Sequence, residues 1–134
     1  MFVRASFKRL CQLASIASVF ALVYLSLAPA QLMTRTQVLS GTEEHWIAYM
    51  LTALIATAST KLRSAFAAAG GLVLLAGLLE IGQNLSIGRH PELTDFSASA
   101  LGAVMGTVIG SLILFAVANR SPLVATATTQ KHST

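Results

Sequence analysis

The chain has 134 residues, of which 54% are hydrophobic and only 10% are charged, whereas an ordinary soluble domain carries about 25% charged residues. A membrane is therefore the expected solvent, and no nucleic acid is expected as a partner because the net charge of +4 comes without a basic patch interleaved with aromatic residues. The single cysteine, Cys11, excludes an intrachain disulfide and a cysteine-based metal cluster.

The first predicted element is a membrane-spanning helix over residues 10–28, because this apolar run reaches the ~20 residues that a span needs. Basic residues precede the run and Ala28-Pro29-Ala30 follows it, so the segment also resembles a secretory signal peptide cleaved before Gln31. The run is longer than the ~7–15 apolar residues of such a signal. A retained span is therefore favoured. Cleavage, which would leave three spans and a periplasmic N-terminus, is the alternative.

Two further spans are predicted over residues 43–60 and 64–85. The link between them, Lys61-Leu-Arg63, is so short that the two helices must be antiparallel neighbours. Positions three, four and seven apart share one face of a helix. The second of these spans therefore has a polar face near its end, made by Gly77, Glu80, Gln83 and Asn84. A carboxylate inside an apolar helix is expensive to bury, which makes Glu80 a functional-site hypothesis by default.

A fourth span is predicted over residues 93–118. One of its faces carries small or polar residues every three or four positions, namely Asp95, Ser99, Gly102, Gly106 and Gly110. Small residues at this spacing let a second helix backbone approach closely. We therefore expect the three glycines to pack against another helix and Asp95 to face protein. The segment 119–134 is rich in threonine and serine and is expected to be a disordered tail.

The basic residues set the expected orientation. If the N-terminus is cytoplasmic, seven of the nine lysines and arginines lie inside and only Arg35 and Arg89 lie outside, in line with the positive-inside rule. The predicted fold is an all-α membrane protein: one domain over residues 1–118, a bundle of four transmembrane helices, with both termini cytoplasmic. All five acidic residues then lie toward the outer end.

His45, Glu80 and Asp95 fall within the outer turns of three helices, so their side chains can meet. A carboxylate bonded to Arg89 would order the turn between the last two spans. A histidine–carboxylate pair could instead act as a general base, which makes these three the candidate catalytic residues. A metal between them would resemble a three-ligand zinc site. No paired-ligand spacing such as H-E-x-x-H occurs, so neither a metal nor another cofactor is expected.

Three motifs stand out along the chain: Tyr24-Leu-Ser26-Leu, Glu44-His45-Trp-Ile-Ala-Tyr49, and the stretch from Glu80-Ile-Gly-Gln83 through Arg89 to Asp95. Together they resemble the VanZ-like family of small bacterial membrane proteins. The last motif is the most specific, because members show Glu-x-x-Gln, then Arg, then Asp-x-x-x-Asn before a glycine-rich helix. This chain departs at Ser99, where members have Asn, and at Gly41-Thr42, where members often have Asp-Lys.

The resemblance implies a four-helix protein of the bacterial inner membrane with its polar motifs gathered at one end. The family motif carries over firmly onto five positions of this chain: His45, Glu80, Gln83, Arg89 and Asp95. The founding member of the family is associated with low-level resistance to the glycopeptide teicoplanin. For this chain the resemblance therefore implies a role in the cell envelope and a link to glycopeptide tolerance.

The favoured function is a non-enzymatic envelope protein that binds a lipid-linked or glycolipid head group at its outer face. Its ligand-binding residues would be Glu80, Gln83, Asn84, Arg89 and Asp95, with Arg89 holding a phosphate or carboxylate. One alternative is a structural subunit that assembles with further copies through Gly102, Gly106 and Gly110. The other is a membrane-embedded enzyme that acts on an envelope lipid with His45 as its base. Membrane lipids are expected partners in every case.

Overall fold

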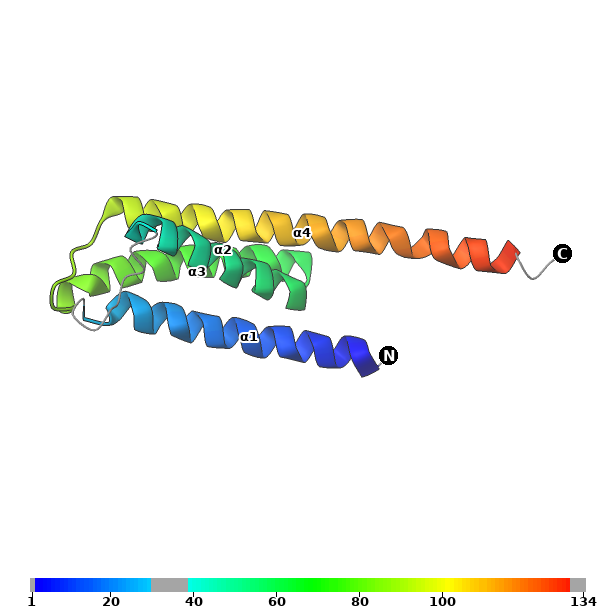
Figure 1. Ribbon diagram of the computed structural model, residues 1–134, viewed down its shortest axis with the longest axis horizontal. Coiled ribbons are helices and arrows are strands. Elements are labelled where there is room, and N and C mark those ends of the chain that lie inside the picture. Colours follow the sequence, from blue (N-terminus) through cyan, green and yellow to red (C-terminus); the bar gives the residue numbers. More distant parts are fainter. Residues whose placement is uncertain (1, 30–38, 131–134) are drawn as a thin grey trace.

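The computed structural model describes residues 2–29 and 39–130, and within these ranges the chain is helical without strands (Figure 1). In chain order the elements are α1 (Phe2–Leu27), α2 (Gly41–Ser59), α3 (Leu62–Gly82), the 3-10 turn η2 (Gln83–Leu85) and α4 (Leu93–Gln130). The four α-helices coincide with the four apolar runs of the sequence. The cleavage site considered before Gln31 lies outside the described residues.

The helices alternate in direction along the bundle, as Figure 1 shows. Helices α1 and α3 run one way and α2 and α4 run the other, so α1 begins and α4 ends at the same end of the bundle. Helix α2 contacts all three other α-helices. It is therefore the central helix, and its most extensive partner is the parallel helix α4.

Three helices are long and apolar enough to cross a membrane, over Ser6–Leu27, Arg63–Leu85 and Leu93–Asn119. Helix α2 is not among them, so length and composition support three of the four predicted spans and leave the span over residues 43–60 a prediction. Its first turn contains Glu43 and Glu44, and three of its buried residues are serine or threonine. Because α2 is covered by protein, it does not need an apolar surface toward lipid.

The buried hydroxyl groups of α2 are satisfied within the helix itself. Thr52, Thr57 and Ser59 each donate a hydrogen bond to a backbone carbonyl of the preceding turn, at 2.8–2.9 Å. A buried polar group is costly only when it lacks a partner. These bonds therefore allow a helix of intermediate polarity to occupy the centre of the bundle.

A capping box fixes the start of α2. The Ser40 hydroxyl accepts from the backbone N–H of Glu43, and the Glu43 carboxylate accepts from the backbone N–H of Ser40 at 2.8 Å. This arrangement satisfies two amides that have no partner inside the helix. The capping box defines where the first turn of α2 begins, and so it fixes the position of His45 along the axis of the bundle.

The glycine-rich face of α4 lies against α2. A Cβ atom added at Gly102 would collide with the backbone carbonyl of Trp46, and one added at Gly106 would collide with that of Met50. At Gly110 it would lie 3.0 Å from the Thr57 side chain. Glycine is thus required here because the two backbones are nearly in contact.

One large side chain occupies the point where the helices meet. Tyr49 of α2 is 1% exposed and belongs to a core cluster with side chains from the three other helices: Leu22, Leu72, Ala76 and Ala103. Tight packing of this kind holds helices together where lipid replaces water. The core therefore connects α2 to every other helix of the bundle.

Two helix ends differ from the predicted boundaries. Helix α1 begins at Phe2, and α4 continues to Gln130, whereas the sequence placed the end of the last span at residue 118. Hydropathy indicates where a helix leaves the lipid, but it does not indicate where the backbone stops being helical. Some residues after position 118, such as Leu123 and Ala125, have a high helix propensity. The segment expected to be a disordered tail therefore starts as a continuation of α4, while residues 131–134 lie outside the described part of the chain.

Candidate functional site

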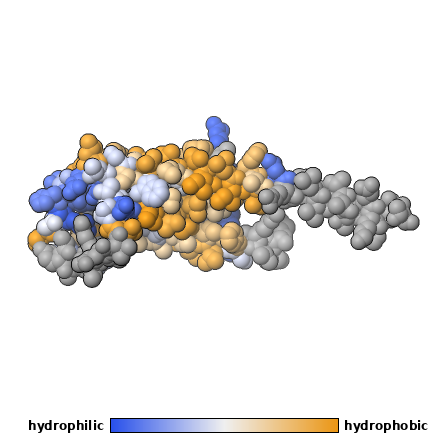
Figure 2. Space-filling model, turned by 45° about the horizontal axis from the view of Figure 1, so that its top comes forward, coloured by the Kyte–Doolittle hydropathy of each residue, from blue (hydrophilic) through white to orange (hydrophobic). Residues whose placement is uncertain are grey.

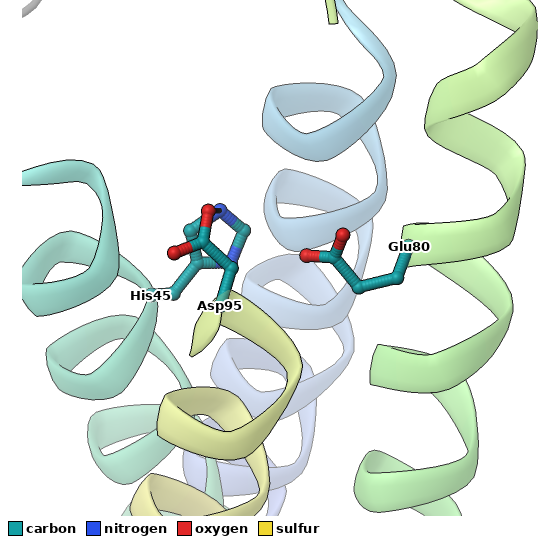
Figure 3. A group of neighbouring side chains, drawn as sticks. All are labelled: His45, Glu80 and Asp95. Carbon is teal, nitrogen blue, oxygen red and sulfur yellow. Dashed lines mark ion pairs between the residues drawn. The ribbon is translucent and has the colours of Figure 1, made fainter. Parts of the chain in front are cut away.

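The two ends of the bundle differ in character. Figure 2 shows hydrophilic side chains gathered at the end where α2 and α4 begin, and a mostly apolar surface along the middle. At this polar end, His45 of α2, Glu80 of α3 and Asp95 of α4 point toward one another (Figure 3). Each offers one N or O atom, and these three atoms all lie within 4.8 Å of one another. Residues from three helices thus form one cluster, which we call the polar cluster.

Asp95 lies in the first turn of α4, where the helix dipole favours a negative charge. Its Oδ1 accepts a hydrogen bond of 2.5 Å from the Thr42 hydroxyl, and its Oδ2 lies 3.9 Å from Nε2 of His45. Both side chains of the His45–Asp95 pair are 16% exposed. The pair is therefore partly shielded but still reachable from the polar end.

The other ring nitrogen of His45 faces Ser99. The distance between Ser99 Oγ and His45 Nδ1 is 3.4 Å. A serine, a histidine and an aspartate are thus adjacent, but Ser99 is 2% exposed. A nucleophile must reach the substrate atom that it attacks, so we assign Ser99 the role of orienting the imidazole ring.

Glu80 is the most buried acidic residue of the cluster, at 8% exposure. Its Oε2 accepts a hydrogen bond of 3.1 Å from the backbone N–H of Glu92, which directly precedes α4. The carboxylate therefore ties the end of α3 to the beginning of α4. This contact explains why an acidic residue stands in an otherwise apolar helix, and it leaves the other carboxylate oxygen for the cluster.

Within the part of the chain that the structure describes, Arg89 bonds to backbone carbonyls and to no carboxylate, unlike one of the chemistries considered from the sequence. Its Nη2 donates to the carbonyl of Leu25 at 2.9 Å, and its Nε donates to that of Ala28 at 3.4 Å. Ser86 of the same loop donates to the carbonyl of Leu27 at 2.7 Å. The last carbonyls of a helix lack intrahelical partners and carry the negative end of its dipole. The loop is therefore docked onto the C-terminal end of α1.

Gln83 and Asn84 were both expected on the polar face with Glu80, but the structure buries the first and exposes the second. Gln83 is 2% exposed, and its Nε2 has no hydrogen-bond partner among the described residues. Asn84 is exposed and bonds locally to the carbonyl of Ile81 at 3.2 Å. Both residues belong to the 3-10 turn that follows α3, in which residues advance by 120° each and depart from the 100° period of the helix.

Removing the Arg89 side chain is expected to weaken the attachment of α1. We expect Arg89→Ala to lower the free energy of unfolding by about 1–2 kcal/mol, since a hydrogen bond to a charged group contributes about 1.5–3 kcal/mol and this one is partly exposed. Unfolding by sodium dodecyl sulfate in mixed micelles, followed by circular dichroism, measures the change. Arg63→Ala is the control, because Arg63 is exposed near the other end of α3. Equal loss in both variants would contradict the docking role.

Two members of the site were not identified as functional from the sequence. The sequence analysis noted Thr42 only as a departure from a family motif. Thr42 nevertheless lies three residues before His45 and so shares its helix face. Ser99 entered as a residue of the small-residue face of α4. Helical spacing relates residues of one helix, but the pairings of Thr42 with Asp95 and of Ser99 with His45 depend on how α2 and α4 are paired.

The fold and the cluster together define a helical protein with three helices able to cross a membrane and a polar site at one end. Comparison of the chain with protein-family models, with curated proteins and with solved structures finds no match. The geometry of the site therefore carries the argument for function.

Proposed function

We propose that the protein is a multi-pass protein of the bacterial inner membrane that binds a lipid-linked or glycolipid head group at its polar end, without catalysing a reaction. The observation that carries the proposal is the convergence of His45, Glu80 and Asp95 from three helices at the end of the bundle (Figure 3). The motifs that resemble the VanZ-like family contain the same three residues, and this membership is part of the proposal.

The chemistry of the polar cluster favours a ligand rich in hydroxyl groups. Two carboxylates and an imidazole offer hydrogen-bond acceptors, which suit the hydroxyls of a sugar. The cation first expected to hold a phosphate, Arg89, is bonded to the end of α1. We therefore assign head-group binding to the acceptors of Glu80 and Asp95, and to Arg89 the role of holding the loop in place.

The proposed orientation places the polar cluster on the outer side of the membrane and both termini in the cytoplasm. The distribution of basic residues supports this orientation. Seven of the nine lysines and arginines lie in segments that it places in the cytoplasm, as the positive-inside rule expects. The alternating helix directions also support it, because α1 begins and α4 ends at the same end of the bundle. In this proposal α2 crosses within the bundle, shielded by the other three helices.

A membrane-embedded enzyme that acts on an envelope lipid is the second candidate. A specific observation favours it: His45 has Ser99 on one ring nitrogen and Asp95 on the other, as a general base with an orienting group would. The structural-subunit alternative has less support. Its proposed interface, the glycine-rich face of α4, already lies against α2 of the same chain.

Complementation of a deletion strain tests the proposal, with sensitivity to teicoplanin and other envelope antibiotics as the measurement. We expect Glu80→Gln and Asp95→Asn to lose at least most of the complementing activity at matched membrane levels, because each removes an acceptor of the cluster. Glu92→Gln is the matched control, since the Glu92 side chain is exposed and its backbone N–H, which bonds to Glu80, remains. Full complementation by both cluster variants would exclude a head-group site here.

His45→Gln separates the two candidates. Glutamine keeps hydrogen-bonding capacity but cannot act as a base near neutral pH. A binding protein should retain measurable complementation with this variant, whereas an enzyme that uses His45 as its base should lose it completely.

A further inference from the structure

The polar cluster brings two carboxyl groups together beside one imidazole. Among the described residues, neither Glu80 nor Asp95 makes an ion pair with lysine or arginine, and their nearest basic group is the His45 imidazole. Arg89, the basic residue of the neighbouring loop, is bonded to carbonyls of α1. Charges that are buried are usually paired or coordinate a metal. Among residues 2–29 and 39–130, the imidazole of His45 is therefore the one basic group that the structure places against the two carboxylates.

The donor atoms fit a metal ion in number, type and distance. One imidazole nitrogen and two carboxylate oxygens lie within 4.8 Å of one another on three different helices. A tetrahedral zinc ion with bonds of about 2.0–2.2 Å holds its ligands roughly 3.3–3.6 Å apart. The His45 Nε2 to Asp95 Oδ2 distance is 3.9 Å, so these two side chains, and Glu80 with them, would move slightly inward around a bound ion.

A second layer of hydrogen bonds already orients each donor. Ser99 faces Nδ1 of His45, the Thr42 hydroxyl donates to Asp95, and the backbone N–H of Glu92 donates to Glu80. Ligating histidines almost always bond through their other ring nitrogen, and ligating carboxylates are themselves hydrogen-bonded. Each of the three residues therefore has the supporting partner that a metal ligand has.

We propose that His45, Glu80 and Asp95 bind one divalent transition-metal ion, with Zn²⁺ as the ion that best suits the mixed nitrogen and oxygen donors. Three protein ligands leave at least one coordination position open. Glu80 and Asp95 belong to both proposed sites, and the open position would let the metal ion itself take a hydroxyl oxygen of the head group.

The test uses the full chain, purified in detergent without a polyhistidine tag and carrying Cys11→Ser so that no thiol competes. Bound zinc is counted by elemental mass spectrometry after dialysis, and affinity is measured by competition with a chelating dye. We expect one ion per chain. We also expect His45→Ala, Glu80→Gln and Asp95→Asn each to weaken binding by at least about 100-fold, and Thr42→Val to weaken it by about 10-fold through the loss of a supporting bond.

Two matched controls replace exposed residues close to the cluster, His90→Ala and Glu92→Gln, and both should bind zinc as the parent chain does. The Co²⁺-loaded parent chain gives a second measurement that needs no variant. Its visible absorption should show the intense bands of a four-coordinate ion, whereas a six-coordinate hydrated spectrum would overturn the proposal.

Absence of zinc binding by the parent chain would also overturn it, as would cluster variants that bind within threefold of the parent. The two proposals, the metal site and the head-group site, are tested by different measurements and can be contradicted separately. If zinc binds while Glu80→Gln still complements the deletion strain, the metal proposal stands and the proposed function fails.

Discussion

Replacing Gly106 by alanine is expected to lower the free energy of unfolding by about 1–3 kcal/mol or more, because the added methyl group has no space between two backbones. Its Cβ would collide with the Met50 carbonyl and lie 3.0 Å from the Cβ of Ala53. A flexible side chain could move aside, but a helix backbone cannot move without separating α2 from α4. Unfolding by sodium dodecyl sulfate in mixed micelles measures the loss.

Gly70→Ala is the matched control for Gly106→Ala. Gly70 is also a helical glycine, but a Cβ added there meets no atom within 4 Å. The same chemical change should therefore be neutral or slightly stabilising, since alanine favours helix over glycine by about 1 kcal/mol. If both variants lost stability equally, close approach of α2 and α4 would not be what requires glycine at position 106.

The second large effect is expected for Tyr49→Ala, which should lower the free energy of unfolding by about 3 kcal/mol, near the values measured when large core side chains are truncated. Tyr49 is 1% exposed and contacts a cluster built from all four α-helices. Lipid replaces water around this bundle, so the loss arises chiefly from the cavity and the missing packing contacts. The same unfolding measurement applies.

Leu74→Ala provides the comparison for Tyr49→Ala. Leu74 of α3 is 66% exposed on the outer surface of the bundle, where lipid chains can fill the space left by truncation. We expect a change of less than about 1 kcal/mol, within the usual range for surface positions. A loss as large as that of Tyr49→Ala would mean that the exposed surface of α3 packs against another protein.

Helix positions and the residues of the polar cluster could be predicted from the sequence, and the physical reason is length. Apolar runs long enough to cross a bilayer alternate with short polar links, so each helix is marked by composition alone. The same alternation places His45, Glu80 and Asp95 near one level of the bundle. The position of α2 was predicted in the same way, although this helix is not among those long and apolar enough to cross a membrane.

The pairing of helices could not be predicted in this way. The glycine spacing of α4 indicates that some backbone approaches closely, but it does not say whether the partner is α2 or another copy of the chain. The sequence likewise does not indicate which acceptors Arg89 bonds. Its bonds to the end of α1 depend on the path of the loop that carries it. Asn84 was misplaced, since it is exposed and bonds locally to the carbonyl of Ile81.

The central position of α2 has a consequence for biosynthesis. This helix is less apolar than its neighbours, and its parallel partner α4 is made only after α3. When α2 leaves the ribosome, the glycine face that will cover it does not yet exist. The contact between α2 and α4 can therefore form only after the last helix has been synthesised, which makes it a late step in the assembly of this small bundle.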